Sequence, residues 1–222
     1  ALGVGRQAAG RRPVIKNDPP LIYHWRTQGH RDFFGEAQAA FAAYRATLEE
    51  ERQHLLSHYE LRDVAVKVVG VGSVGTWCGI LLLLASEQDP LFLQVKEARA
   101  SVVEAYTGRS IYPNHGQWVV NGCRLMQSAS DLFLGWVKGS GGRHFHVRQL
   151  KDTKISPLVE VFSRSVMMHY ADLCGWTLAR AHARSGEPAK ISGDLGKSDK
   201  FDEAIADFSA AYADQSERDH KA

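Results

Sequence analysis

The sequence is poor in cysteine, lacks long apolar runs and carries almost no net charge. Its three cysteines, Cys78, Cys123 and Cys174, are far apart and show no C-x-x-C spacing, which argues against a disulfide framework or a structural zinc site. We therefore expect reduced thiols and a cytoplasmic protein. No apolar stretch is as long as a membrane span, and the N-terminal residues do not form a secretory signal. The 27 basic and 25 acidic residues nearly balance, so we expect neither a membrane nor a nucleic acid as partner.

The most informative part of the 222-residue chain is residues 66–96, in which three apolar runs alternate with two turns. The first turn contains the spacing G-x-G-x-x-G and one serine: Gly70, Gly72, Ser73 and Gly75. Glycines allow backbone N–H groups to approach a phosphate, because no side chain blocks them. Lys96, at the end of the third run, can supply the positive charge that a phosphate needs. The stretch therefore predicts a phosphate-binding site, and the alternative is a glycine turn with no ligand.

Two nucleotide-binding arrangements fit this stretch. In a dinucleotide-binding unit the segment after the glycines is a helix, and Glu97 is the acidic residue that follows the next strand. In a kinase-like lobe the same segment is a strand, and a hairpin leads back to the lysine strand. The period of Trp77–Ala85 does not decide between them, because its apolar residues are continuous. Its short length, the Asp89-Pro90 stop and the alternation along Leu91–Lys96 favour the strand.

The order of the other segments also favours a kinase-like lobe. We expect helices at residues 34–59, 98–106, 114–128, 163–185 and 201–215, and strands at residues 63–69, 77–84, 91–96, 131–137 and 144–150. In the helix at 114–128 we expect the inner face to consist of Trp118, Val119, Gly122, Leu125 and Met126. The predicted fold is α+β, with a five-stranded antiparallel sheet lobe. We expect an N-terminal extension and helix at 1–60, the sheet lobe at 61–155 and a helical C-terminal part at 156–222.

Several stretches together resemble one protein family. They are residues 63–76, 91–98, 119–136, 147–154, 174–186 and 212–220. The family is the uncharacterised bacterial domain-of-unknown-function family twenty-two fifty-two, which is grouped with the protein-kinase-like fold, and the resemblance covers nearly all of Pro19–His220. It implies a kinase-like sheet lobe and ATP binding, but no established reaction. It also implies that this chain is the C-terminal part of a longer protein, whose missing N-terminal part carries loops similar to those of antibiotic phosphotransferases.

These considerations define a candidate site and its alternatives. The residues expected to bind ATP are Gly70, Gly72, Ser73, Gly75, Lys96 and Asn121. We expect magnesium ligands and catalytic carboxylates to lie outside this chain, so that the fragment alone is inactive while the intact protein transfers a phosphoryl group to an unknown acceptor. Asn121 stands where family members tend to have a glutamate, the natural ion-pair partner of the strand lysine, and it favours a non-catalytic, pseudokinase-like binding module as the alternative.

Three further motifs are given structural interpretations. Gly193-Asp194-Leu195 resembles a phosphotransferase motif but lacks the accompanying histidine, so we expect a surface loop. His144 and His146 alternate on one strand without a third metal ligand. We expect Arg148 to fix the connector after the last strand.

Overall fold

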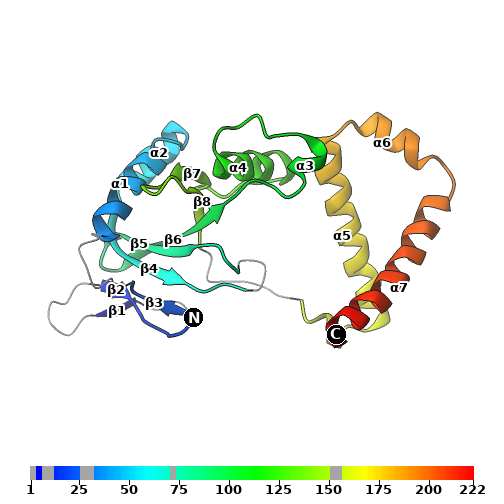
Figure 1. Ribbon diagram of the computed structural model, residues 1–222, viewed down its shortest axis with the longest axis horizontal. Coiled ribbons are helices and arrows are strands. Elements are labelled where there is room, and N and C mark those ends of the chain that lie inside the picture. The colour runs from blue at the N-terminus through cyan, green and yellow to red at the C-terminus, as the bar shows by residue number, and fades with distance from the viewer. Residues whose placement is uncertain (1–3, 7–12, 26–32, 71–73, 151–156) are drawn as a thin grey trace. The chain divides into compact units, whose positions relative to one another are not determined.

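The computed structural model describes residues 4–6, 13–25, 33–70, 74–150 and 157–222 of the chain. The chain divides into two compact units, Ala1–Val161 and Phe162–Ala222. The strands, all in the first unit, are β1 (Val4–Arg6), β2 (Pro13–Ile15), β3 (Ile22–Tyr23), β4 (Glu60–Lys67), β5 (Cys78–Ser86), β6 (Asp89–Ala98), β7 (Gly135–Lys138) and β8 (His144–Gln149) (Figure 1). The helices of this unit are α1 (Phe33–Arg45), α2 (Glu50–Ser57), α3 (Glu104–Thr107) and α4 (His115–Met126), with a 3-10 turn at Val159–Val161. The second unit contains α5 (Arg164–Ser185), α6 (Pro188–Leu195) and α7 (Lys200–Lys221).

The main sheet has six strands in the order β3-β4-β5-β6-β8-β7, and each neighbouring pair is antiparallel. The segment after the glycine turn is strand β5, as predicted, and it pairs with β4 and β6. The dinucleotide-binding alternative needs a helix there and parallel strands, so this alternative is wrong. The five predicted strands are present, and β3 adds a sixth at the edge.

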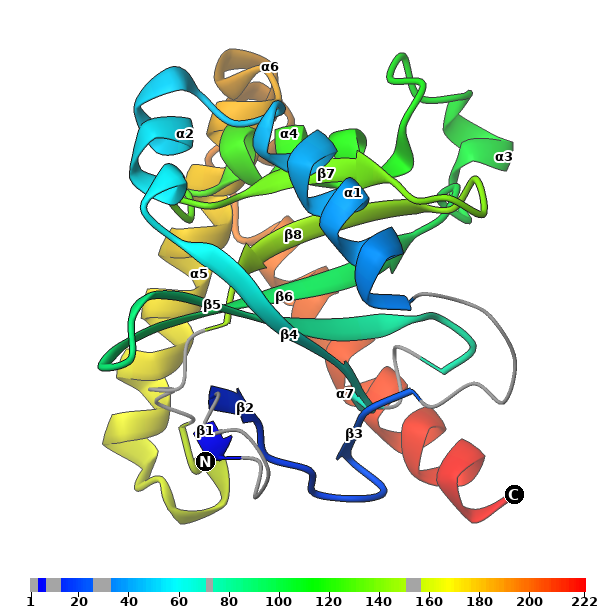
Figure 2. The same cartoon turned by 90° about the vertical axis from the view of Figure 1, so that its left-hand side faces the viewer.

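Both faces of the sheet are covered, which explains the continuous apolar run in β5. Leu81 and Leu83 point to the side covered by α1, which we call the α1 face. Ile80 and Leu82 point to the opposite side and pack against Ile15 of β2; we call this side the β2 face. Figures 1 and 2 show α1 and the β1–β2 pair on different sides of β4. A central strand buried on both sides shows no alternation, because no position faces water.

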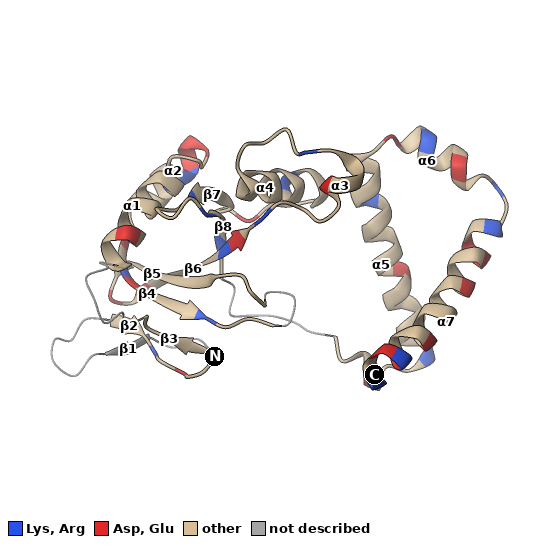
Figure 3. Ribbon diagram, viewed as in Figure 1, with Lys and Arg blue, Asp and Glu red and all other residues tan. Residues whose placement is uncertain are grey.

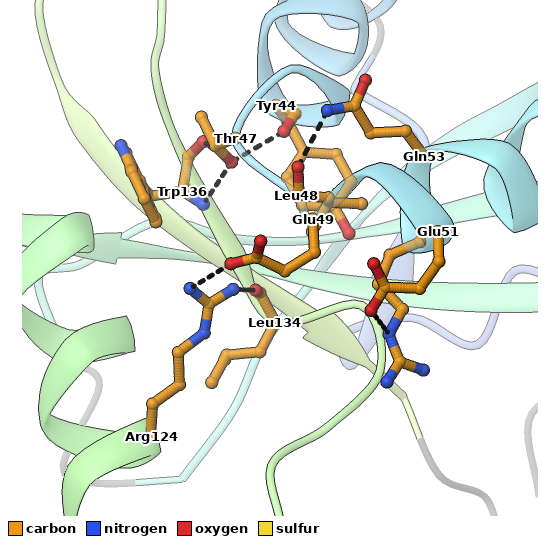
Figure 4. A network of polar contacts seen from close by, with 10 residues as sticks. Tyr44, Thr47, Leu48, Glu49, Glu51, Gln53, Arg124, Leu134 and Trp136 are labelled. Carbon is orange, nitrogen blue, oxygen red and sulfur yellow. Dashed lines mark hydrogen bonds and ion pairs between the residues drawn. The ribbon is translucent and has the colours of Figure 1, made fainter.

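The predicted single helix over residues 34–59 is in fact two helices, α1 and α2. The Thr47 hydroxyl lies 2.7 Å from the Tyr44 carbonyl and 3.1 Å from the Trp136 carbonyl, and it accepts a hydrogen bond from the Trp136 N–H. The Gln53 side chain donates to the Leu48 carbonyl over 2.8 Å (Figure 4). These bonds to β7 and within the connector satisfy polar groups that a continuous helix would pair internally, so the helix ends after Arg45.

The helix predicted at 114–128 is present as α4, but its predicted inner face is wrong. Gly116 and Val120 are the buried residues, whereas Leu125 is 49% exposed and Met126 is 44% exposed. A Cβ atom at Gly116 would lie 2.1 Å from the Phe145 carbonyl oxygen, so only glycine allows α4 this close to β8. Arg124 holds the C-terminal end of α4.

Arg124 ties α4 to Leu134, the residue before β7, and to the α1–α2 connector. Its Nη2 donates to the Leu134 carbonyl over 2.9 Å, and its Nη1 lies 3.8 Å from the Glu49 carboxylate (Figure 4). The polar side that we expected to face away from the sheet therefore contacts it. Hydrogen bonding to a buried carbonyl outweighs the hydrophobic preference of the exposed leucine and methionine.

The second unit consists of three helices without a buried residue. Gly193, Asp194 and Leu195 form the last turn of α6, so the surface loop predicted there is wrong. Pro188 occupies the first turn of α6, where the missing N–H has no intrahelical partner to lose. No helix among the described residues is both long and apolar enough to cross a lipid bilayer.

Candidate phosphate-binding site

The glycine turn joins β4 to β5 at one end of the sheet. Gly72 and Ser73 lie outside the described residues, so the turn is described by Gly70 and Gly75. Gly75 has a φ of +76°, a conformation that residues with a side chain rarely adopt. A Cβ atom at Gly70 would meet no atom within 4 Å. The glycine at 75 is therefore required by the backbone, and Gly70 leaves open space beside the chain.

Glu97 holds the end of this turn against β6. Its carboxylate accepts hydrogen bonds from the Trp77 N–H and the Arg99 Nε, each over 2.9 Å, and Arg99 also donates to the Gly75 carbonyl. The side chain of Glu97 is only 7% exposed. Burial by itself raises the pKa of this carboxyl, but the hydrogen bonds and the nearby Arg99 and Arg143 charges outweigh burial and lower it. Glu97, which would bind a ribose in a dinucleotide-binding unit, thus anchors the glycine turn.

Lys96 lies on the β2 face, at the same end of the sheet as the glycine turn. Its backbone is directly opposite Cys78, near the start of β5, and His146 in β8. Within the described residues no hydrogen bond or ion pair joins Lys96 to Asn121 or to Glu104. Asn121 lies half-buried in α4. The structure therefore brings the described glycines and Lys96 to one end of the sheet but does not connect Lys96 to Asn121.

Two more residues of this face, Gln94 and Arg148, are not among the site residues that the sequence predicted. Gln94, one side-chain row from Lys96, is 4% exposed, and its carbonyl oxygen accepts from Arg148 Nε over 3.2 Å and from Nη2 over 3.0 Å. The Gln94 amide also donates to the Cys78 sulfur over 3.5 Å. Arg148 is therefore oriented over the sheet, whereas the connector that we expected it to fix, residues 151–156, lies outside the described residues. The alternation along residues 92–96 and 144–148 predicts that Gln94 and Arg148 lie on the same face as Lys96.

The end of the β2 face near the glycine turn carries positive charge. Burial, followed by the nearby Arg148 and Lys96 charges, lowers the pKa of His146 from 6.5 to about 4, so the imidazole is neutral at pH 7. Burial raises the pKa of the Cys78 thiol, which stays protonated. The charge near Cys78 comes from Lys67, Lys96 and Arg148. Figure 3 colours the basic residues of these strands blue.

The arrangement suits an anion better than a metal ion. No group of three or more His, Cys, Asp or Glu side chains that could hold a metal is present in the part of the chain that the structure describes. Lysine and arginine donate to phosphate oxygens, and a partly buried position strengthens this attraction. The expectation that magnesium ligands lie outside this chain stays a prediction.

The fold and this face define a mixed α+β protein with one antiparallel sheet and a cationic sheet end. The family described as "Uncharacterized protein conserved in bacteria (DUF2252)" matches residues 4–222. The chain therefore belongs to this bacterial family, as its sequence resemblance implied. No curated protein and no solved structure matches the chain.

Proposed function

We propose that this protein binds the phosphates of a nucleotide through the glycine turn at Gly70–Gly75 and Lys96. The observation that carries the proposal is the position of Lys96. Lys96 is half-buried, and its backbone is paired with that of Cys78, near the start of β5. No described residue gives its ammonium group an anionic partner. A partly buried charge without a partner is unfavourable, and a bound phosphate would supply the missing countercharge.

The residues around Lys96 fit a polyphosphate chain. Lys67 and Arg148 add two positive charges on the same face, and the two hydrogen bonds that Arg148 donates to the Gln94 carbonyl oxygen hold its guanidinium in one orientation. An arginine held in this way loses less side-chain entropy when it binds an anion. The neutral His146 leaves the net positive charge of the face unchanged at pH 7.

In phosphoryl transfer, the part assigned to this sheet is to position and neutralise the transferred phosphates. ATP would supply the phosphoryl group, and magnesium would bridge its oxygens when both are bound. The carboxylates that orient the acceptor and hold magnesium are proposed to lie outside this chain, and the acceptor is not specified by any feature of the site. The kinase-like grouping belongs to this proposal, because it rests on the order of strands, turn and helix.

A second candidate is a non-catalytic nucleotide-binding module. In a kinase, a glutamate from the helix after the lysine strand pairs with the lysine and completes the active arrangement. Here Asn121 offers only a neutral amide, and Glu104 has a buried carboxylate oxygen without a partner among the described residues instead of an ion pair with Lys96. This observation favours binding without turnover.

Calorimetric titration of the intact protein with ATP tests the proposal. Lys96→Met should weaken binding by about 1.5–3 kcal/mol, the contribution of a hydrogen bond to a charged group, which is roughly a 10- to 150-fold rise in Kd. Lys138→Met, which removes an exposed lysine from the edge strand β7, is the matched control and should change Kd little. No ATP binding, or equal affinity for wild type and Lys96→Met, refutes the site. Binding without transfer to any acceptor supports the second candidate.

A further inference from the structure

A pocket of about 100 Å³ lies on the α1 face of the sheet, at the end near the glycine turn; we call it the α1-face pocket. Helix α1 forms one wall, and strands of the sheet form the floor. Most of the lining is apolar, and it includes Phe33, Phe41, Trp77, Leu81, Val95 and Phe145. The packing between α1 and the sheet therefore leaves a space that a small molecule can enter.

The α1-face pocket and Lys96 are on opposite faces of the sheet. Val95 lines the pocket and is the residue before Lys96 in β6. Successive side chains of a strand point to opposite faces. A ligand in this pocket is therefore separated from Lys96 by the sheet, and the pocket is a site in addition to the proposed phosphate site.

The lining of the α1-face pocket fits one aromatic ring. The Trp77 indole makes edge-to-face pairs with Phe33 and Phe145, at centroid distances of 6.1 and 5.6 Å. A ligand ring can add pairs of the same kind, which form at separations of about 4.5–7 Å. An engineered protein cavity of about 150 Å³ binds benzene. A pocket of about 100 Å³ therefore accepts one ring at most, with its substituent in the mouth.

The mouth of the pocket lies between α1 and the β7–β8 turn, because the exposed residues of the lining are there. They are Glu36 in α1 and Ser140, Gly141 and Arg143 in the turn. The Glu36 carboxylate accepts a hydrogen bond from the Ser140 hydroxyl over 2.9 Å. The mouth thus offers one cation and one anion, and the anion already has a hydrogen-bond donor.

Arg143 is the better placed of the two charges to bind a ligand. Its guanidinium lies 5.8 Å from the centroid of the Phe145 ring and 3.9 Å from the Glu97 carboxylate. Glu97 accepts shorter hydrogen bonds, of 2.9 Å each, from Trp77 and Arg99. The Arg143 guanidinium donates no hydrogen bond to a residue that the structure describes. A carboxylate can accept two parallel hydrogen bonds from such a guanidinium, so the mouth favours an anionic ligand.

We propose that the α1-face pocket binds small molecules that carry one aromatic ring and one carboxylate. The ring lies among Phe33, Trp77 and Phe145, and the carboxylate pairs with Arg143 at the mouth. The size of the pocket and its aromatic lining select the ring, and the hydrogen-bond donors of Arg143 select the charge.

Fluorine NMR of the intact protein labelled with fluorotryptophan tests the proposal, with the Trp77 signal assigned by Trp77→Phe. The probes are benzoate, benzamide and benzamidine, which share one shape and are negative, neutral and positive. Benzoate should shift the Trp77 signal saturably and bind about three- to fivefold more tightly than benzamide, as expected for an ion pair at a half-open mouth. Benzamidine should bind most weakly. No saturable shift with benzoate would overturn the site, and tightest binding of benzamidine would overturn the anionic ligand.

Two variants separate the ring from the charge. Arg143→Gln should make the Kd values of benzoate and benzamide equal, whereas Arg45→Gln, which removes an exposed arginine from the far end of α1, should keep their ratio. Ala37→Leu fills the pocket from α1 and should weaken all three probes at least tenfold. Ala39→Leu adds the same side chain at an exposed position of α1 and should change none of the Kd values. Equal Kd values for wild type and a folded Ala37→Leu variant would show that the probes bind elsewhere.

Competition with ATP tests whether the pocket is separate from the proposed phosphate site. Saturating ATP should leave the Kd of benzoate unchanged, because the sheet lies between the two sites. Displacement of benzoate by ATP would make the pocket part of the nucleotide site and overturn a separate aromatic-acid site. Failure of ATP to bind would overturn the proposed function and leave the benzoate result unaffected.

Discussion

Replacing Gly79 with alanine perturbs the packing at the start of β5, directly after the glycine turn. A Cβ atom built at Gly79 would lie 2.2 Å from the nearest carbon of the Trp77 indole and 2.8 and 3.0 Å from two others. Contacts this short cannot persist, so either the indole or the strand must move. The indole is held on its far side, since its ring centroid lies 6.1 Å from that of Phe33 and 5.6 Å from that of Phe145, both in edge-to-face geometry.

The size of the effect follows from these contacts. Inserting a methyl group into a packed region costs about 1–3 kcal/mol. If the indole moves instead, two aromatic pairs are lost, each worth about 0.5–1.5 kcal/mol. Both routes lead to a loss of about 1–3 kcal/mol in the free energy of opening of the sheet, because neither removes the clash without disturbing the other ring contacts.

Amide hydrogen exchange is the suitable assay, because it reports the opening of β5 and β6 separately from the second unit. A loss of about 1–3 kcal/mol corresponds to exchange that is roughly 5- to 150-fold faster at the β5 and β6 amides. Gly122→Ala is the control, since a Cβ atom there meets nothing within 4 Å and alanine stabilises a helix interior by about 0.5–1 kcal/mol. Unchanged exchange in Gly79→Ala would refute the argument. In a Trp77→Ala background the Gly79→Ala change should become nearly neutral.

Two other predictions concern titration and turnover. The pKa of His146 is lowered to about 4, so its contribution to stability is complete above pH 6.5 and is lost as the pH falls toward 4, by roughly 3 kcal/mol in total. His146→Gln should therefore flatten this part of the pH profile of urea unfolding, and an unchanged profile would contradict the assignment. Residues 1–222 alone should release no phosphate from ATP above background, because of where the candidate aspartates lie. Asp194 lies in the last turn of α6, Asp199 is the residue before α7, Asp152 lies outside the described residues, and the others are on the helices α5 and α7: Asp172, Asp202, Asp207, Asp214 and Asp219. Turnover abolished by Asp194→Asn would place a catalytic carboxylate in this chain.

Local signals predicted the sheet because each of its strands carries its own punctuation. The Asp89-Pro90 stop and the glycines at 139–142 mark tight antiparallel connections, and these connections require neighbouring strands to pair. The break between α1 and α2 had no such signal. It depends on Thr47 reaching Trp136, a residue 89 positions away, and an apolar period cannot report a contact of this kind.

Of the positively charged residues at the candidate site, the sequence predicted only Lys96. Alternation placed Lys96 on one face, but the neighbours that give this face its charge come from β4 and β8, and their register is set by tertiary pairing. Arg148 looked like part of the connector because its sequence neighbours are charged. Its actual orientation depends on Gln94, which is buried in the strand beside it. Asn121 was selected by analogy with a helix position, and the face that α4 presents to the sheet is not the face that the apolar pattern favours.

Strand β2 illustrates what the apolar pattern leaves undetermined about the burial of β5. The sequence identifies Ile80, Leu82 and Leu84 as buried but does not say whether a ligand or the protein itself buries them. Asp63 decides this, because its carboxylate accepts the Ile15 N–H and holds the isoleucine over these residues. A carboxylate that satisfies a strand-edge N–H replaces the backbone partner that an extra sheet strand would supply. The burial of these residues by Ile15 therefore depends on a hydrogen bond between residues 48 positions apart, which no local pattern can report.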